Sequence, residues 1–424
     1  MMKHTSTQFD AQFACAVLLL CASGQLFAQS ETAPSLMQNL NPSGSVRAAY
    51  FSASRKLDEK HDLGAGAVWL KFAPTLLDKK LRLVVDGWLR NDESFEHQST
   101  GKLREGYLDF SAGSTDFRIG KQIIVWGRAD ELNPTDNLNP RDYTLLTPET
   151  NDQRFGVAAA KAAYHYQDWA LTGIWLPRFS ANIFPTAATP GVYYTRPTPH
   201  GNQGALKLER SGGAVDWSVS YFSGLDLNPD SKIGGISASG LNFILENKRI
   251  HVVGFDAATV VGRYGLRTEA AYTWTSYVGD PQVKKPFLYA VVGADRTFFT
   301  NLNINAQYYF RRVASYQDPR NITDPILRPT VILAAGIANQ LDRFQHGMSI
   351  RIANKWLNDT LEGEIAGVLS FTRHDYTIKP KLIYAFNDQV KGTLGIDIFR
   401  GDSETYYGRL RKNSSLYAEI KYSF

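Results

Sequence analysis

The chain has 424 residues, of which 12% are aromatic, and its 46 Lys and Arg against 41 Asp and Glu give a formal net charge of +5. A mean hydropathy of -0.27 excludes a helical membrane protein, which needs apolar runs of about 18 residues or more. The small charge excess is spread along the chain, apart from a short basic run at 409–412. This distribution argues against a nucleic-acid partner.

The N-terminus has the pattern of a secretory signal peptide. Lys3 precedes the apolar run 13–22, and small residues follow around Ala28. We therefore predict a signal peptide at 1–28 and a periplasmic N-terminal arm at 29–42. Both cysteines lie in the predicted signal peptide, so we expect neither a disulfide nor a thiolate metal site in the mature chain.

From residue 43 onwards, apolar and polar residues alternate over long stretches. In 302–310 the even-numbered residues are apolar and the odd-numbered residues are polar, and 81–90 shows a similar period of two. The predicted strands are often ten to fifteen residues long, whereas strands of soluble sheets have about five or six residues. Long strands with one apolar and one charged face are typical of a transmembrane barrel with lipid outside and water inside.

The predicted strands number eighteen and lie at 43–55, 63–77, 79–93, 101–113, 115–128, 155–168, 169–179, 201–213, 214–225, 248–262, 263–277, 284–299, 300–313, 345–357, 359–374, 376–387, 389–401 and 413–424. Every second connection is a tight turn, whereas the longest of the others are 129–154, 180–200, 226–247 and 314–344. Such alternation is expected of short periplasmic turns and long outer loops. We predict an all-β fold: one antiparallel up-and-down transmembrane barrel over 43–424, with about 18 strands and 16 as the alternative.

The last predicted strand continues to the final residue. Its alternate positions are apolar, and they are occupied by Leu416, Ala418, Ile420, Tyr422 and Phe424. In a closed barrel this strand must pair with the first strand. The pattern resembles the C-terminal signal by which bacterial outer-membrane barrels are recognised for assembly. The resemblance implies a location in the bacterial outer membrane, with outer-membrane lipids, lipopolysaccharide and the barrel-assembly machinery as partners.

The connection 129–154 is the candidate functional loop. Three prolines and repeated Asn-Pro steps favour an ordered backbone that is neither helix nor sheet. The loop is acidic, and with its flanking base it supplies the candidate constriction residues Arg128, Asp130, Glu131, Asp136, Asp142, Glu149, Asp152 and Arg154. An acidic loop opposite a basic wall would set up a field across the channel that orients polar or anionic solutes.

The stretches "GKQIIVWG" and "NPRD" carry a second resemblance. They are similar to a motif in a large proteobacterial group of outer-membrane barrels and, more distantly, to the Gly-basic-Gln stretch of alginate-export-type barrels. In porins generally the third outer loop folds inward, so the resemblance implies that 129–154 narrows the pore. A cap over the barrel surface and a calcium site are the alternatives.

Alternation along the strands also places bases on the lumen face. The candidate pore-lining bases are Arg82, Arg90, Arg118, Arg311, Arg351, Lys355, Lys379, Lys381 and Lys391. Acids such as Asp86, Glu269 and Glu364 lie among them. We expect most of these bases to pair with acids across strands and to stiffen the wall.

The sequence contains no recognisable catalytic or cofactor motif. The eight histidines lack metal-ligand spacing, and there is no nucleophile elbow and no phosphate-binding glycine motif. We predict no enzyme activity, cofactor or metal site. The predicted function is an outer-membrane channel for passive or substrate-selective diffusion of small polar or anionic solutes. The alternatives are an export pore for a polymer such as a polysaccharide, acting with a periplasmic partner, and a structural or enzymatic barrel; the oligomeric state stays open.

Overall fold

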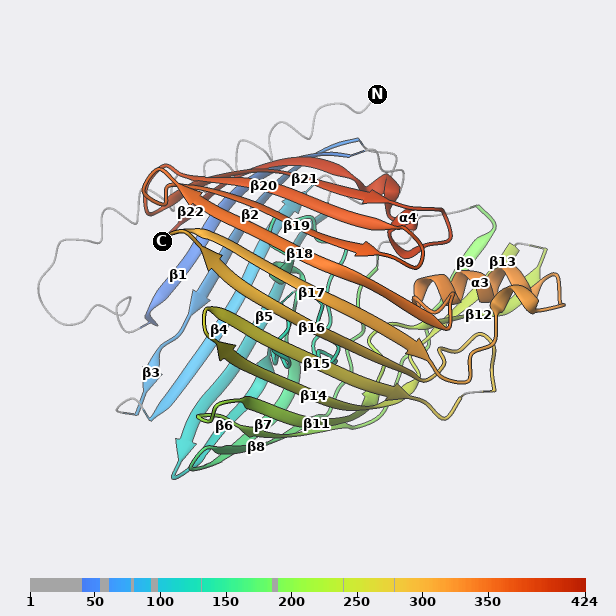
Figure 1. Ribbon diagram of the computed structural model, residues 1–424, viewed down its shortest axis with the longest axis horizontal. Coiled ribbons are helices and arrows are strands. Elements are labelled where there is room, and N and C mark those ends of the chain that lie inside the picture. Colours follow the sequence, from blue (N-terminus) through green and yellow to red (C-terminus); the bar gives the residue numbers. More distant parts are fainter. Residues whose placement is uncertain are drawn as a thin grey trace, which may run out of the picture.

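The alternating segments of the sequence form a single antiparallel sheet that closes on itself, as a computed structural model shows (Figure 1). The structure describes residues 40–53, 61–77, 80–92, 98–130, 132–184, 190–238, 240–277 and 279–424. The predicted signal peptide and most of the predicted arm lie outside the described residues. Within the described ranges, no helix is long and apolar enough to cross a bilayer.

Eighteen strands make up the barrel wall in the described part of the chain: β1 (Pro42–Ala53), β2 (Asp62–Phe72), β4 (Leu81–Asp92), β5 (Gln98–Ala112), β6 (Thr115–Gln122), β7 (Val157–Tyr166), β8 (Trp169–Leu176), β10 (Gln203–Arg210), β11 (Asp216–Leu225), β14 (Arg249–Val261), β15 (Tyr264–Trp274), β16 (Phe287–Phe298), β17 (Leu302–Val313), β18 (Phe344–Trp356), β19 (Leu361–Ser370), β20 (Tyr376–Ala385), β21 (Val390–Arg400) and β22 (Ser415–Ser423). Each predicted strand overlaps one of them, so the predicted fold and the count of 18 are confirmed.

Closure of the sheet comes from its first and last strands. Antiparallel pairing of β1 with β22 runs from Ser45 opposite Ser423 to Ala53 opposite Ser415. Beyond the ladder, the Phe424 N–H donates to the Gly44 carbonyl at 3.1 Å. Pairing of the terminal strand removes the open edges that a sheet in lipid could not tolerate.

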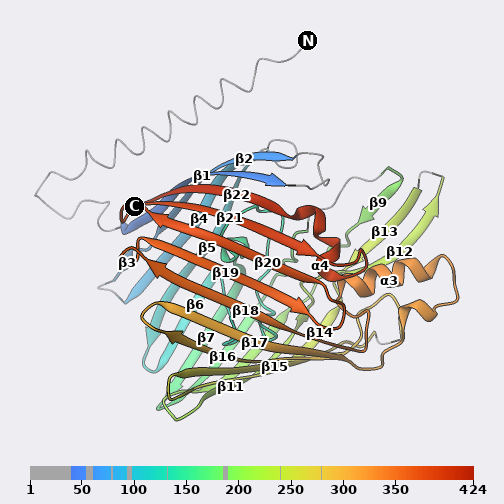
Figure 2. The same cartoon turned by 45° about the horizontal axis from the view of Figure 1, so that its top comes forward.

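The short elements lie mostly at one end of the barrel, where Figures 1 and 2 show the long loops. There β9 (Val192–Thr195), β12 (Asp230–Ser237) and β13 (Gly240–Glu246) form a separate sheet. The same loops contain α3 (Leu327–Ile337), α4 (Tyr406–Arg409), η2 (Pro319–Asn321) and η3 (Arg411–Asn413). The remaining pieces are β3 (Thr75–Leu76), which pairs with β4, and η1 (Thr150–Gln153). We call this end the loop end and the other the turn end.

The two faces of the wall follow the predicted alternation. On β17, Gln307 is 2% exposed and Tyr309 8%, whereas Tyr308 between them is 44% exposed. Outward positions elsewhere are large, apolar and exposed, as for Leu206 and Val292. A continuous exposed apolar surface is unfavourable in water and is the surface that lipid requires. The described wall is therefore that of a membrane-spanning barrel.

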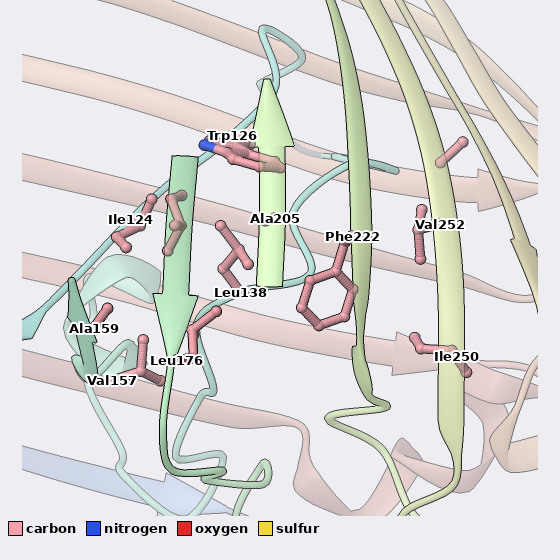
Figure 3. Close-up of a cluster of buried hydrophobic side chains, with 12 residues drawn as sticks. Ile124, Trp126, Leu138, Val157, Ala159, Leu176, Ala205, Phe222, Ile250 and Val252 are labelled. Atoms are coloured by element: carbon pink, nitrogen blue, oxygen red, sulfur yellow. The ribbon is translucent and has the colours of Figure 1, made fainter. Parts of the chain in front are cut away.

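A hydrophobic core lies inside the barrel, against one side of its wall (Figure 3). Ile124, Trp126 and Leu138 come from the connection between β6 and β7. They pack on inward side chains of β7, β8, β10, β11 and β14, among them Phe222 and Val252. The predicted fifth strand ends early, at Gln122, because the apolar run that follows packs into the lumen instead of continuing the wall.

Candidate pore constriction

Residues 123–156, which we call the lumen segment, cross the barrel interior between β6 and β7; Glu131 lies outside the described residues. A carboxylate of the wall binds the beginning of this segment. Glu269 of β15 is fully buried and accepts hydrogen bonds from the backbone N–H groups of Arg128 at 3.0 Å and Ala129 at 3.1 Å. It also accepts from the Thr135 N–H at 2.7 Å and the Thr135 hydroxyl at 2.8 Å.

Arg128 binds the same side of the wall through its side chain. Its Nε donates to Asp256 of β14 at 2.7 Å, and its Nη2 donates to Glu209 of β10 at 2.6 Å. Asp256 lies directly opposite Glu269 in the sheet, and both lie near the middle of their strands. The lumen segment is therefore bound well inside the barrel, and not only at its mouth. Charge-assisted hydrogen bonds of this kind are stronger than neutral ones.

The acids of the lumen segment are used as ion-pair partners. Asp142 binds Lys102 of β5 at 3.1 Å, and Asp152 binds Arg47 of β1 at 2.5 Å. Asp130 binds Arg267 of β15 at 2.8 Å and accepts from Asn305 of β17.

Asp136 pairs with Arg154 inside the segment itself. Four bases thus offset four of the acids that the sequence analysis assigned to an acidic loop surface. Glu149 is exposed.

The far side of the lumen segment contacts the β1 to β5 wall. Arg104 of β5 donates to the carbonyls of Arg154 at 3.1 Å and Asn151 at 3.0 Å. Arg90 of β4 donates to the Leu146 carbonyl at 2.7 Å. Together with the Glu269 and Arg128 contacts, these bonds show that the segment spans the lumen from β15 to β1.

The "GKQ" and "NPRD" motif residues hold the two ends of the lumen segment together. The Asn139 side chain accepts from the Ile124 N–H at 2.5 Å and donates to the Phe155 carbonyl at 3.2 Å. Gln122 is fully buried and donates to the Ala159 carbonyl at 2.9 Å. Gly127 has φ +91, and a Cβ there would overlap Asn133 and the Glu269 carboxylate. The sequence pattern marks these motif residues but does not indicate their contacts.

Four of the nine predicted pore-lining bases pair with carboxylates of the wall. Ion pairs or hydrogen bonds bind Arg118 to Asp109 at 2.9 Å, Arg351 and Lys381 to Glu364, and Lys355 to Glu362 at 4.0 Å. Arg82 is exposed on β4. In the described part of the chain, no carboxylate lies within 4.0 Å of Lys379 or Lys391.

Lys379 and Lys391 lie on the neighbouring strands β20 and β21. Lys391 is directly opposite Lys421 of β22, which in turn is directly opposite Arg47 of β1. The Lys379 ammonium lies 5.6 Å from the centre of the Phe399 ring. Like charges on directly opposed residues are destabilising, and acids nearby offset part of this charge: Arg47 pairs with Asp152, and Asp397 of β21 interacts with Lys379.

Metal binding has no geometric support in the described ranges, where no group of three or more His, Cys, Asp or Glu side chains is placed to hold an ion.

The closed wall and its apolar exterior define a β-barrel of the outer-membrane type. No protein-family model and no curated protein sequence matches the chain. The fold does match solved structures. OccK5 (OpdH) of Pseudomonas aeruginosa has a TM-score of 0.52 and 11% identity, over 90% of this chain and 96% of that chain.

Two further structures have a TM-score of 0.54 and 10% identity: OccK1 (OpdK) of Pseudomonas aeruginosa and OccAB3 of Acinetobacter baumannii. Each match covers 90% of this chain and 98% of the other. At these identities the likeness is one of fold, and the chain has the fold of the Occ channels. Neither the resemblance to alginate-export-type barrels nor the loop motif finds support in these comparisons.

Proposed function

We propose that this protein is a diffusion channel of the bacterial outer membrane for small polar or anionic solutes, narrowed by the lumen segment. The observation that carries the proposal is the set of bonds to Glu269, Asp256 and Arg47, which bind the segment to opposite sides of the wall inside the barrel. A segment bound in this way is a permanent constriction. Solutes can pass only through the part of the lumen that the segment and its hydrophobic core leave open.

The path that remains favours anions. The core of Figure 3 occupies the lumen on the β7 to β14 side. Solutes would then pass along the opposite wall, where Lys379, Lys391 and Lys421 lie. Positive charges in a narrow aqueous path attract anions more strongly than they would in open water. OpdK, which shares the fold, has been crystallised with vanillate, a small organic acid. A solute of similar size and charge suits the path proposed here.

We also propose that the barrel contacts lipid and lipopolysaccharide through its apolar exterior and is inserted by the barrel-assembly machinery through its last strand. Two residues of the predicted signal point outward and are strongly exposed, Leu416 at 48% and Ile420 at 60%. Phe424 lies at the end of the β22 ladder. The strand thus presents an apolar row to a receptor or to lipid.

The channel proposal is tested by conductance in planar bilayers. The purified protein should form open channels, and replacing 133–148 with a short Gly-Ser linker should raise the single-channel conductance. The same deletion removes Asp136 and Asp142, the partners of Arg154 and Lys102, so the reversal potential should shift toward anions. Heat-modifiable migration in gels controls for folding of the barrel. A silent wild-type protein, or a deletion variant with unchanged conductance, contradicts the proposal.

A further inference from the structure

The outer face of the barrel carries an unpaired base at its loop end. Even-numbered residues of β17 face outward, and the last of them is Arg312, which is exposed. It lies directly opposite Leu288 of β16 and Phe344 of β18. Among the described residues, its guanidinium has neither a carboxylate partner nor a hydrogen-bond acceptor. A charge on a lipid-facing wall is costly unless water or a charged headgroup reaches it.

A histidine lies beside Arg312 on the same outer face. His346 follows Phe344 by two residues, and its Nδ1 lies 3.1 Å from the Tyr308 hydroxyl. The ring centres of Phe344 and Phe371 lie 5.4 and 5.6 Å from that of the imidazole. In the described ranges Nε2 has no protein partner. When the Tyr308 hydroxyl donates to Nδ1, the proton of the neutral imidazole is on Nε2, which is then a donor for a ligand.

The same arrangement recurs elsewhere on the outer face. His251 is the third residue of β14, as His346 is of β18. Its Nδ1 lies 2.8 Å from the Tyr221 hydroxyl, and its ring stacks on Trp274 with 5.3 Å between centres. Arg249 precedes it by two residues on the same face. Rings with polar tips gather where a membrane meets water, so this band marks the height of the headgroups at the loop end.

The charge around Arg312 is positive. Arg343 is exposed, and its carbonyl accepts from the backbone N–H of Val313 at 2.8 Å, next to Arg312. The neighbouring acid, Asp342, is neutralised by Arg373, which donates to its two oxygens at 2.5 and 2.7 Å. We call the group formed by Arg312, Arg343 and His346 the rim patch.

We propose that the rim patch binds the phosphate of a phosphorylated lipid in the outer leaflet. The planar fork of a guanidinium matches phosphate oxygens, and a phosphate monoester offers three acceptor oxygens and up to two charges. Below the patch, Tyr308 and Val292 are 44% and 57% exposed and give the acyl chains an apolar surface. The inference rests on the lipid contact stated under the proposed function and assigns its headgroup site.

Native mass spectrometry of the full-length protein in mild detergent tests the site with three probes. They are lipid A, the phosphorylated glycolipid of lipopolysaccharide; the same lipid without its phosphates; and inorganic phosphate. Lipid A should bind at least about tenfold more tightly than its dephosphorylated form, and an equal concentration of inorganic phosphate should not displace it. Equal binding of the two lipids overturns the proposal, and so does displacement by inorganic phosphate, which would make this a site for free anions.

Three variants locate the site. Arg312→Gln should weaken lipid A binding about tenfold or more. Arg328→Gln removes the same charge from an exposed position on α3 and should leave binding unchanged. His346→Phe keeps an aromatic ring but removes the donor, so it should weaken binding about threefold or more; it decides the matter if Arg312→Gln fails to fold.

Two outcomes of this series contradict the site. Wild-type affinity in both Arg312→Gln and His346→Phe overturns the proposal. Equal losses in Arg312→Gln and Arg328→Gln overturn it as well, because binding would then follow net charge and not position. Heat-modifiable migration in gels controls for folding of each variant.

Conductance of the same preparations separates this inference from the channel proposal. Open channels with equal binding of the two lipids refute the rim patch and leave the channel in place. Preferential binding of lipid A without conductance refutes the channel and leaves the rim patch in place.

Discussion

The substitution Glu269→Gln tests the binding of the lumen segment most directly. Each carboxylate oxygen of Glu269 accepts two hydrogen bonds from the lumen segment. Oε1 accepts from the N–H and the hydroxyl of Thr135, and Oε2 accepts from the N–H groups of Arg128 and Ala129. A glutamine keeps one accepting oxygen and turns the other into a donor, so two of the four bonds are lost in either amide orientation.

At the lower value of about 1.5 kcal/mol for each hydrogen bond to a charged group, the loss amounts to about 3 kcal/mol. This loss shifts the equilibrium from the bound toward the released lumen segment by about a hundredfold. Single-channel recording should then show larger and noisier open currents than those of the wild type. The matched control is Glu364→Gln, because Glu364 is also a wall carboxylate but binds Arg351 and Lys381 of the wall. If Glu269→Gln recordings match the wild type in amplitude and noise, Glu269 does not hold the constriction.

Two further predictions concern the wall and its closure. Ile304→Arg should destabilise the barrel by roughly 1–2 kcal/mol in urea titrations on vesicles, because Ile304 faces outward near the turn end, where the cost of a charge is below its midplane value. Asn305→Arg should be tolerated beside Asp130 and should change ion selectivity instead. Equal costs of unfolding at the two positions would rule out this register. Deletion of 422–424 removes the Phe424 bonds to Gly44 and the Tyr422 pairing with Val46, so heat-modifiable, membrane-integrated protein should disappear; a normal yield of barrel would contradict the role given to the last strand.

The strands could be predicted from the sequence because each depends on a local pattern. A residue of β17 faces lipid or lumen according to whether its position is even or odd, and the neighbouring strands do not change this alternation. The run Ile123 to Trp126 shows where parity stops being informative. It reads as a continuation of β6, but the backbone N–H of Ile123 binds the Glu105 carboxylate at 2.8 Å and that of Ile124 binds Asn139. Side chains distant in sequence therefore decide where the strand ends.

The partners of the loop acids could not be predicted for a similar reason. The composition of 129–154 reveals its acids, but Asp152 pairs with a base 105 residues away and Asp130 with one 137 residues away. The alternation does place Glu269 on the lumen face. An inward acid directly opposite another acid on the next strand indicates that it has a hydrogen-bond partner outside the wall. Its four donors come from backbone and side chain of one loop. No pattern in the sequence encodes that arrangement.

The pairing of charges also indicates which side chains can act on a solute. An ion pair such as Asp142 with Lys102 is nearly neutral to an ion several ångströms away, so these pairs contribute mainly to the position of the lumen segment. The bases without a paired carboxylate are different, and they are spread along the barrel. Arg311 lies toward the loop end of β17, whereas Lys391 and Lys421 lie near the turn end of β21 and β22. In the channel proposed above, an anion would meet attractive charges on both sides of the lumen segment, which would lower the barrier to passage without one deep binding site that retains it.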